Sequence, residues 1–354
     1  MSLIHSIETS FPKNYYEQQE LINHLSTYWK EKVFNLDRVK AIHKNVLVQG
    51  RHLALEPKEY FNLLDMEKKN KVFIEKALDL STEAVGNLLE KAQIKPNEVS
   101  VLMSNTVTGF SIPSLEARLM NRIDFSPHTK RVPLLGLGCL AGVAGINRVM
   151  DYLEGHPSEA VVFFTVELCS LTLQLEDLSM ANIISSGLFG DGAAAVLCVG
   201  KDHKLAQESK LKWIDGLSSF YPNTENTMGW DIKNTGLKII LGQDVPKICS
   251  EKLPKDLESI LNSNELLKED LNFFMAHPGG PKVLFAMEQA LGLEEGSLKH
   301  SWNSLAQKGN MSSVSVLDIA KRTMESEKFD HEYGIMAALG PAFCSEIGLY
   351  QWVN

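Results

Sequence analysis

A cysteine at a glycine-rich turn is the first residue of this chain whose type and position could support chemistry. The segment from Leu134 to Gly145 leads from an apolar run through glycines into a helix of small residues, and Cys139 falls at the turn. The positive end of a helix favours a thiolate, which is the nucleophilic form of cysteine. The glycines permit a sharp turn and the close approach of a ligand. The position fits a nucleophile and a buried core thiol equally well.

Two further candidates, a histidine and an asparagine, stand at the ends of expected elements. His277 ends the strand Leu271–Ala276, at the edge where open α/β sheets build their sites. Asn310 precedes a helix, within Lys308-Gly-Asn-Met-Ser-Ser313. A satisfied structural histidine and a turn or N-cap asparagine are the alternatives that position alone leaves open.

The tight turn that begins with Phe189 carries an aromatic ring and an acid. Phe189 is either a core residue or a pocket wall, and its spacing does not separate the two. Asp191 is expected to bond the turn backbone. Among the other cysteines, Cys169 follows a strand end and could line a cavity, whereas Cys198 lies within a strand and is expected to be core.

Composition and charge exclude several classes of protein. The 354 residues include 35 Lys and Arg against 44 Asp and Glu, a net charge of −9, so a nucleic-acid-binding protein is disfavoured. The five cysteines are widely spaced and form no Cys-x-x-Cys pair, so neither a disulfide framework nor a metal site is expected. No secretory signal and no run long enough to span a bilayer is visible, which predicts a soluble cytoplasmic protein.

Apolar spacing predicts the elements that must position these side chains. The first 70 residues are expected to be mostly helical, with amphipathic pieces at Glu17–Leu25 and Tyr60–Leu64. From Val72 onward, strands alternate with helices, which indicates a buried sheet of α/β type. The expected helices are Lys71–Leu89, Cys139–Leu153, Pro281–Leu291 and Ser312–Met324. The expected strands are Val99–Met103, Val132–Leu135, Ala160–Val166, Ala193–Val199, Leu271–Ala276, Ile335–Leu339 and Cys344–Val353.

The chain divides into two halves of similar content, which suggests an internal duplication. A polar stretch at Lys201–Glu208 predicts the boundary, so the halves are 1–205 and 206–354.

Four short motifs together resemble those of the type III polyketide synthases, the chalcone synthase-like family. They are Gly138-Cys139 with its small-residue helix, Leu188-Phe-Gly-Asp-Gly-Ala-Ala-Ala195, Ala276-His-Pro-Gly-Gly-Pro281 and Gly309-Asn-Met-Ser-Ser313. They occur in the family's order at compatible spacing, and the resemblance extends over nearly the whole chain. It implies a thiolase-like αβαβα layered fold, a homodimer, and condensation of malonyl-CoA with an acyl-CoA starter. No carrier protein and no cofactor beyond these substrates are implied.

The resemblance also implies roles for the candidate residues. It assigns Cys139 as the nucleophile that holds the starter and the growing chain. His277 and Asn310 match the pair that hydrogen-bonds the thioester carbonyl during malonyl decarboxylation. Phe189 matches the gatekeeper phenylalanine between the CoA tunnel and the reaction cavity.

The cavity wall and the subfamily are implied by weaker likenesses. Gly340 and Pro341 resemble the centre of the family's Gly-Phe-Gly-Pro-Gly loop, whose outer glycines and phenylalanine are replaced here. The segment from Met228 to Ile239 is similar to the microbial branch that makes alkylpyrones or alkylresorcinols, although the indole of Trp230 would block a tunnel for a long starter. The remaining residues matching cavity-lining positions are Thr108, Cys169, Thr172 and Ile239.

Three other functions stay open beside a synthase that makes a pyrone or resorcinol-type product. A ketoacyl-ACP synthase III shares the fold and a Cys-His-Asn triad, but the Gly309 motif and Gly340-Pro341 favour the polyketide synthase. A Cys-His-Asn hydrolase would need a water route to the acyl-enzyme. A binding protein without catalysis would have an inert Cys139. The starter, the number of extensions and the mode of ring closure do not follow from single residues.

Overall fold

The computed structural model describes residues 2–33 and 35–353, and a nine-stranded mixed sheet dominates it. The order of the strands across this sheet is β11-β12-β13-β8-β1-β7-β6-β4-β5. The strands are β1 Ser2–Ser10, β4 Val101–Asn105, β5 Lys130–Leu134, β6 Ala160–Leu168, β7 Asp191–Gly200, β8 Leu211–Phe220, β11 Leu271–Ala276, β12 Tyr333–Gly340 and β13 Cys344–Trp352. Two small sheets pair β2 (Asn14–Glu17) with β3 (Gly50–Leu53) and β9 (Met228–Lys233) with β10 (Gly236–Leu241).

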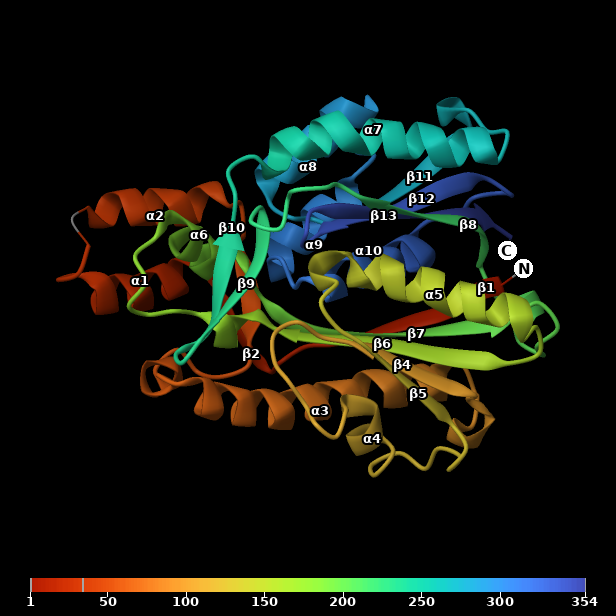
Figure 1. The fold of residues 1–354 in the computed structure, drawn as a ribbon, viewed down its shortest axis with the longest axis horizontal. Helices are drawn as coiled ribbons and strands as arrows, with labels where there is room; N and C mark the ends of the chain where they lie inside the picture. The colour runs from red at the N-terminus through yellow and green to blue at the C-terminus, as the bar shows by residue number, and fades with distance from the viewer. Residues whose placement is uncertain (1, 34, 354) are drawn as a thin grey trace.

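The large sheet has two arms, one with β1, β7, β6, β4 and β5 and one with β8, β13, β12 and β11. Helices cover the outer face of each arm and fill the space between the two arms. They are α1 Gln18–Trp29, α2 Leu36–Asn45, α3 Met66–Lys91, α4 Leu115–Leu119, α5 Ala141–Gly155, α6 Met180–Leu188, α7 Val245–Ser263, α8 Pro281–Leu291, α9 Lys299–Lys308 and α10 Ser313–Ser326. Helices α5 and α10 lie between the arm with β6 and β7 and the arm with β12 and β13 (Figure 1). Helix α3 covers the first arm from outside, and α7 and α8 cover the second. The expected αβαβα layering is confirmed.

Three apolar clusters hold these layers together. One is built from α5, α10 and the inner faces of both arms, one from α3 against β6 and β7, and one from α7 and α8 against β12 and β13. Burial of apolar surface on both faces of the sheet accounts for its nearly continuous apolar strands. Strand β6, for example, is buried at all nine positions.

The two arms of the sheet repeat one arrangement of strands. In each arm a parallel pair (β4 and β6, or β11 and β12) is followed by two antiparallel neighbours, β7 and β1 in one arm and β13 and β8 in the other. The arms join through β1 and β8, which pair at three positions only. We propose that the arms descend from one duplicated unit, and the boundary between residues 205 and 206 stays a prediction.

The structure corrects three expectations about local structure. The prediction of mostly helical structure was wrong for residues 2–10, because β1 is a central strand whose Ile4 and Ile7 are buried. The piece at Tyr60–Leu64 is a short 3-10 helix, Glu59–Asn62. The helix expected from Cys139 begins at Ala141 and is preceded by a 3-10 turn. The expected strand Leu271–Ala276 and helix Pro281–Leu291 are confirmed to the residue.

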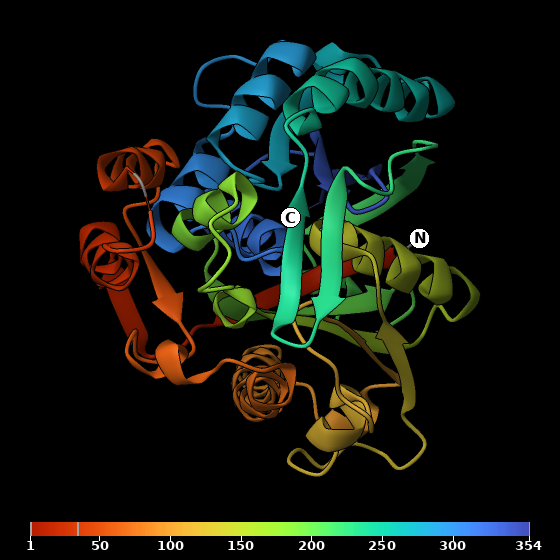
Figure 2. The same cartoon turned by 60° about the vertical axis from the view of Figure 1, so that its left-hand side comes forward.

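The hairpin of β9 and β10 stands apart from the large sheet, beside α6 (Figure 2). It forms part of the wall of the cavity described below. Within residues 2–33 and 35–353, none of the helices combines the length and the apolar character that crossing a membrane requires.

Candidate active site

Cys139 lies at a junction between the two halves of the chain. It sits in a 3-10 turn (Gly138–Leu140) directly before α5. Gly138 has a φ of +58°, and the ring of Pro341 packs against the place where a side chain would stand. Glycine is required at position 138, because a side chain would be strained at this φ and would overlap the proline ring. The glycine of the first half and the proline of the second therefore fix the turn that carries the thiol.

A cavity of about 630 Å³ opens beside this turn. Cys139, His277, Asn310 and Phe189 all line it. The histidine and asparagine come from the second half of the chain, and the cysteine and phenylalanine from the first. The structure therefore brings together the four residues that the sequence singled out.

His277 continues β11 and turns its ring into a buried position. Its backbone N–H donates to the carbonyl oxygen of Ala337 at 2.9 Å, which extends the pairing with β12. The residue is 3% exposed, and neither ring nitrogen has a hydrogen-bond partner among the described residues. Burial lowers the pKa of the imidazole to about 3, so the ring is neutral at pH 7. A buried, unpartnered imidazole is costly for stability, which favours a role toward a ligand over a structural one.

Asn310 uses one end of its amide for the fold and leaves the other largely free. Its Oδ1 accepts a hydrogen bond from the backbone N–H of Ser312 at 2.8 Å, so the turn role considered above is confirmed. Its Nδ2 reaches only the carbonyl oxygen of Gly279, at 3.4 Å. The amide N–H groups thus lie in the wall of the cavity that His277 also lines, where they can donate to a substrate oxygen.

The Cys139 thiol is protonated at rest. Burial raises its pKa to about 11, a hydrogen bond with the Ser312 side chain lowers it, and the Glu167 carboxylate raises it further. Burial therefore opposes the thiolate that the helix end was expected to favour. Loss of water around the thiol outweighs the helix end.

Glu167 is a buried acid whose charge acts on the Cys139 thiol, and sequence reasoning did not assign it. Its carboxylate is fully buried and accepts hydrogen bonds from the hydroxyls of Ser313 at 2.7 Å and Thr108 at 2.9 Å, and from the N–H of Val107 at 3.1 Å. A weaker contact at 3.3 Å reaches the Ser312 hydroxyl. Burial raises the pKa of Glu167 to about 7. The available signal was a lone acid in an otherwise apolar strand, since charged residues are almost never fully buried without a reason.

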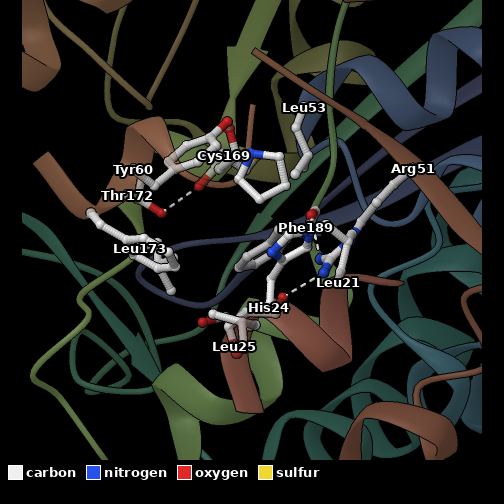
Figure 3. Close-up of a pocket in the computed structure, with 15 residues that line it drawn as sticks. Leu21, His24, Leu25, Arg51, Leu53, Tyr60, Cys169, Thr172, Leu173 and Phe189 are labelled. Atoms are coloured by element: carbon white, nitrogen blue, oxygen red, sulfur yellow. Dashed lines mark hydrogen bonds between the residues drawn. The ribbon is translucent and has the colours of Figure 1, made fainter. Parts of the chain in front are cut away.

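The expected cavity-lining residues divide into three groups. Cys169, Ile239 and Pro341 line the large cavity. Thr172 lines a smaller cavity of about 60 Å³ (Figure 3), which shares Cys169 and Phe189 with the large one. Thr108 and Gly340 line neither: the first bonds Glu167, and the α-carbon of the second faces Leu137 and Leu140. Trp230 of β9 lies in the wall of the large cavity, as its position in the hairpin requires.

No cluster of three or more His, Cys, Asp or Glu side chains able to hold a metal ion occurs within residues 2–33 and 35–353. The groups that meet in the cavity are a thiol, a neutral imidazole and a primary amide. They supply a nucleophile, a proton acceptor and hydrogen-bond donors.

Two family models match the chain over overlapping parts. Residues 40–276 match the model described as FAE1/type III polyketide synthase-like protein. Residues 215–352 match the model described as chalcone and stilbene synthases, C-terminal domain. The two matches together contain all four cavity residues discussed above.

Bacterial proteins are similar to this chain over nearly its whole length. A 1,3,6,8-tetrahydroxynaphthalene synthase of Streptomyces peucetius subsp. caesius is 37% identical, over 98% of this chain and 92% of the relative. A putative chalcone synthase of Bacillus subtilis (strain 168) is 36% identical, over 99% of both chains. The crystal structure of 1,3,6,8-tetrahydroxynaphthalene synthase from Streptomyces coelicolor A3(2), a bacterial type III polyketide synthase, superposes with a TM-score of 0.93 at 26% identity and covers 99% of both chains. The chain therefore belongs to the type III polyketide synthase family, with its thiolase-like fold.

Proposed function

We propose that the protein catalyses decarboxylative Claisen condensation of malonyl-CoA onto an acyl chain held on Cys139. One observation carries the proposal. Cys139, His277 and Asn310 come from both halves of the chain and line a single cavity, and the imidazole has no partner among the described residues. The chain belongs to a family of condensing acyltransferases, which agrees with this chemistry.

The first step transfers an acyl group from CoA to Cys139. Because the thiol and the imidazole are both neutral at rest, His277 accepts the thiol proton as the sulfur attacks the thioester carbonyl. The C–S bond to CoA breaks, and the imidazolium returns the proton to the departing CoA thiolate. His277 is then neutral again and carries one N–H.

The second step releases carbon dioxide from malonyl-CoA and forms a carbon–carbon bond. The C–C bond to the carboxylate breaks, and its electron pair makes an enolate whose oxygen needs fixed donors. The His277 N–H and the Asn310 amide supply them, a role typically worth about 3 kcal/mol per donor. The enolate carbon attacks the acyl carbonyl on Cys139, and the thiolate leaves. No external base is required.

Phe189 presents an apolar ring to the same cavity. An apolar surface disfavours the charged carboxylate and favours neutral carbon dioxide. The ring therefore assists decarboxylation by excluding water and charge.

The substrates that we propose are malonyl-CoA and an acyl-CoA starter, with no further cofactor. Repeated extension followed by ring closure gives a pyrone or resorcinol-type product. The bacterial relatives agree with a microbial enzyme, and the alkylpyrone or alkylresorcinol branch stays a prediction. Trp230 in the cavity wall limits the space for a long starter.

We propose that two copies of the chain form a homodimer in the cytoplasm. Ile112 is 95% exposed, and Leu135, which follows the edge strand β5, is 66% exposed. An exposed apolar side chain beside an unpaired strand edge, such as Leu135, or in a loop, such as Ile112, is a liability unless a partner covers it. The five cysteines are all free, which fits a reducing compartment.

The test is to incubate the purified protein with malonyl-CoA and a panel of acyl-CoA starters and to identify the products by mass. Products that contain several malonyl-derived units, formed without carrier protein, support the proposal. A single condensation that requires malonyl-ACP would show a ketoacyl synthase instead. Release of the free acid with no new carbon–carbon bond would show a hydrolase.

A further inference from the structure

The smaller cavity and the large one share a wall of two residues. Cys169 and Phe189 are the only residues that line both cavities in the described part of the chain. The smaller cavity is mostly apolar, with leucines from α1 and β3 and the ring of Phe61 around it. One charged side chain, Arg51 of β3, also lines it (Figure 3). What holds this wall decides how much space the acyl chain has.

Arg51 is bound to the backbone that carries Phe189. Its Nη1 donates to the carbonyl oxygen of Phe189 at 2.7 Å, and its Nη2 donates to that of Ser186 at 2.6 Å. Arg51 is 3% exposed, and its Nε has no hydrogen-bond partner in the described part of the chain. The last carbonyls of a helix lack partners within the helix. Arg51 supplies two such partners where α6 ends.

Two other buried side chains complete the support of this helix end. Gln18 of α1 donates to the carbonyl oxygen of Gly187 at 2.8 Å. Nε2 of His43 in α2 lies 2.9 Å from the carbonyl oxygen of Ile183. The His43 ring also packs against Gly187, where a β-carbon would stand only 2.6 Å from the ring. Three elements thus converge on the last turn of α6, immediately before Phe189.

On the opposite side, the same backbone is tied to Asn310. The N–H of Asn310 donates to the carbonyl oxygen of Leu188 at 2.9 Å, and the N–H of Gly190 donates to that of Asn310 at 3.0 Å. Residues 186–190 are therefore fixed between Arg51 and the loop between α9 and α10, which carries Asn310, the proposed oxyanion donor. Movement of Phe189 would disturb both contacts.

The second wall residue, Cys169, is held through its neighbour by Asp191. The carboxylate of Asp191 accepts hydrogen bonds from the backbone N–H of Ala54 at 2.7 Å and from that of Ser170 at 2.8 Å. Ser170 is the neighbour of Cys169. Asp191 therefore holds the backbone next to Cys169, and Arg51 holds that of Phe189. Burial lowers the pKa of the Arg51 guanidinium to about 10, and the attraction of Asp191 opposes this shift.

We propose that Arg51 is a positioning residue that holds Phe189 as the wall between the two cavities and thereby limits the acyl chain that the large cavity accepts. The proposal rests on the proposed function, because it concerns the substrate of that site. Arg51 does not touch the reacting atoms. Its effect passes through the carbonyl oxygens of Phe189 and Ser186.

The test compares Arg51→Met, which keeps the length of the side chain but removes both donors, with Arg51→Lys, which keeps the charge and one donor point. The readout is the ratio of kcat/KM for a long acyl-CoA starter to that for a short one, with the product masses. Loss of a charged hydrogen bond predicts a change of roughly tenfold in this ratio for the Met variant. The Lys variant should fall between it and the unchanged protein.

Two matched variants separate positioning from general destabilisation. Arg148→Met removes a half-buried arginine that bonds Glu346 and Ser218 away from both cavities, so it should lower the melting temperature without changing the ratio. Phe189→Leu should change the ratio in the same direction as Arg51→Met, and the double variant should add nothing. An unchanged ratio in Arg51→Met, or effects that multiply in the double variant, would overturn the proposal.

A second readout is independent of catalysis. In the Cys139→Ala background, labelling of Cys169 by a long alkyl maleimide, followed by peptide mass, should become several-fold faster in Arg51→Met as the wall loosens. Equal labelling rates would overturn the proposal. If the unchanged protein makes no polyketide at all, the proposed function fails, and the labelling experiment still decides the role of Arg51.

Discussion

The ring of Pro341 occupies the space that a β-carbon at position 138 would need. A side chain there would stand 2.5 Å from Cγ of the proline, closer than carbon atoms approach without a bond. The contact joins the turn of the nucleophile to the end of β12, so the position of Cys139 depends on a residue about 200 positions away in the sequence.

Gly138→Ala is expected to lower stability by at least about 3 kcal/mol and to abolish condensation, because strain at positive φ adds to the overlap with Pro341. Gly136→Ala is the matched control. It also has positive φ (+85°) but nothing within 4 Å, so its cost should stay at about 1–2 kcal/mol. Denaturant unfolding measures both, and equal costs would contradict the steric role of Pro341.

Cys139→Ala is expected to reduce condensation by at least about 1,000-fold, because the acyl chain then has no covalent attachment. Decarboxylation of malonyl-CoA should persist, since its donors remain. Product mass spectrometry and carbon dioxide release measure the two steps separately. The control is Cys249→Ala in α7, a core thiol that should leave condensation intact. Normal product formation by the Cys139 variant would sink the mechanism.

His277→Ala and Asn310→Ala should each slow malonyl decarboxylation by about 100- to 1,000-fold, the usual effect of removing one oxyanion donor. The double variant should lose less than the product of the two effects, because both donors serve one oxygen. His52→Gln, whose ring bonds the Pro12 carbonyl elsewhere, is the control. An unchanged rate of carbon dioxide release would remove either residue from the site.

Alkylation of Cys139 by iodoacetamide should become faster by about tenfold per pH unit from pH 7 to 10, because only the thiolate reacts. The pKa of the thiol is raised to about 11 and that of His277 is lowered to about 3, so neither group titrates near neutral pH. A rate that is already at its plateau at pH 7 would indicate the thiolate–imidazolium pair instead.

Glu167→Gln should lower the pKa of Cys139 and accelerate its alkylation at pH 8 by several-fold, because a negative charge near the thiol is removed. The variant also has a stability signature. Burial raises the pKa of Glu167 from 4.5 to about 7. The contribution of Glu167 to the free energy of unfolding is therefore fully present below pH 4.5 and is lost as the pH rises through 7. The melting temperature of the Gln variant relative to the unchanged protein should therefore be higher at pH 8 than at pH 5. A pH-independent difference would contradict the raised pKa.

Ile112→Asp is expected to weaken the proposed homodimer by roughly tenfold or more, because a charge would be placed in an apolar contact. Leu267→Asp is the control. It is 66% exposed, as Leu135 is, but lies next to β11, at the opposite edge of the sheet. Sedimentation at several concentrations measures both, and an unchanged Ile112→Asp dimer, or a monomeric unchanged protein, would rule out this interface.

The elements that the sequence predicted well are those with continuous apolar runs, such as β6 and β11. Strand β1 was missed because serines, a histidine and a glutamate interrupt its apolar positions, and Ser2 is buried only because its hydroxyl bonds Met150 and Glu154. Helix α7 was missed because Pro246 and Pro254 break its pattern, although the first stands in its first turn and the second lies within it. Local patterns do not report which tertiary neighbours satisfy a polar group.

The same limit applies to the site. Glycine turns and strand ends identified Cys139, His277 and Asn310, because each depends on local backbone geometry. The raised pKa of the thiol could not be predicted, since it depends on burial and on Glu167, which no spacing rule connects to it. The support of Phe189 by Arg51 was invisible for the same reason.

The position of β1 and α10 has a consequence for synthesis on the ribosome. Once β7 is made, the first arm of the sheet has all its strands, β1, β4, β5, β6 and β7, and can form. The inner face of this arm and the Cys139 turn nevertheless stay partly uncovered until α10 is made, more than a hundred residues later. The nascent chain therefore carries an exposed apolar face and an uncovered nucleophile until translation is nearly finished. A chain truncated before residue 313 should be a target for chaperones and proteases rather than a partly active enzyme.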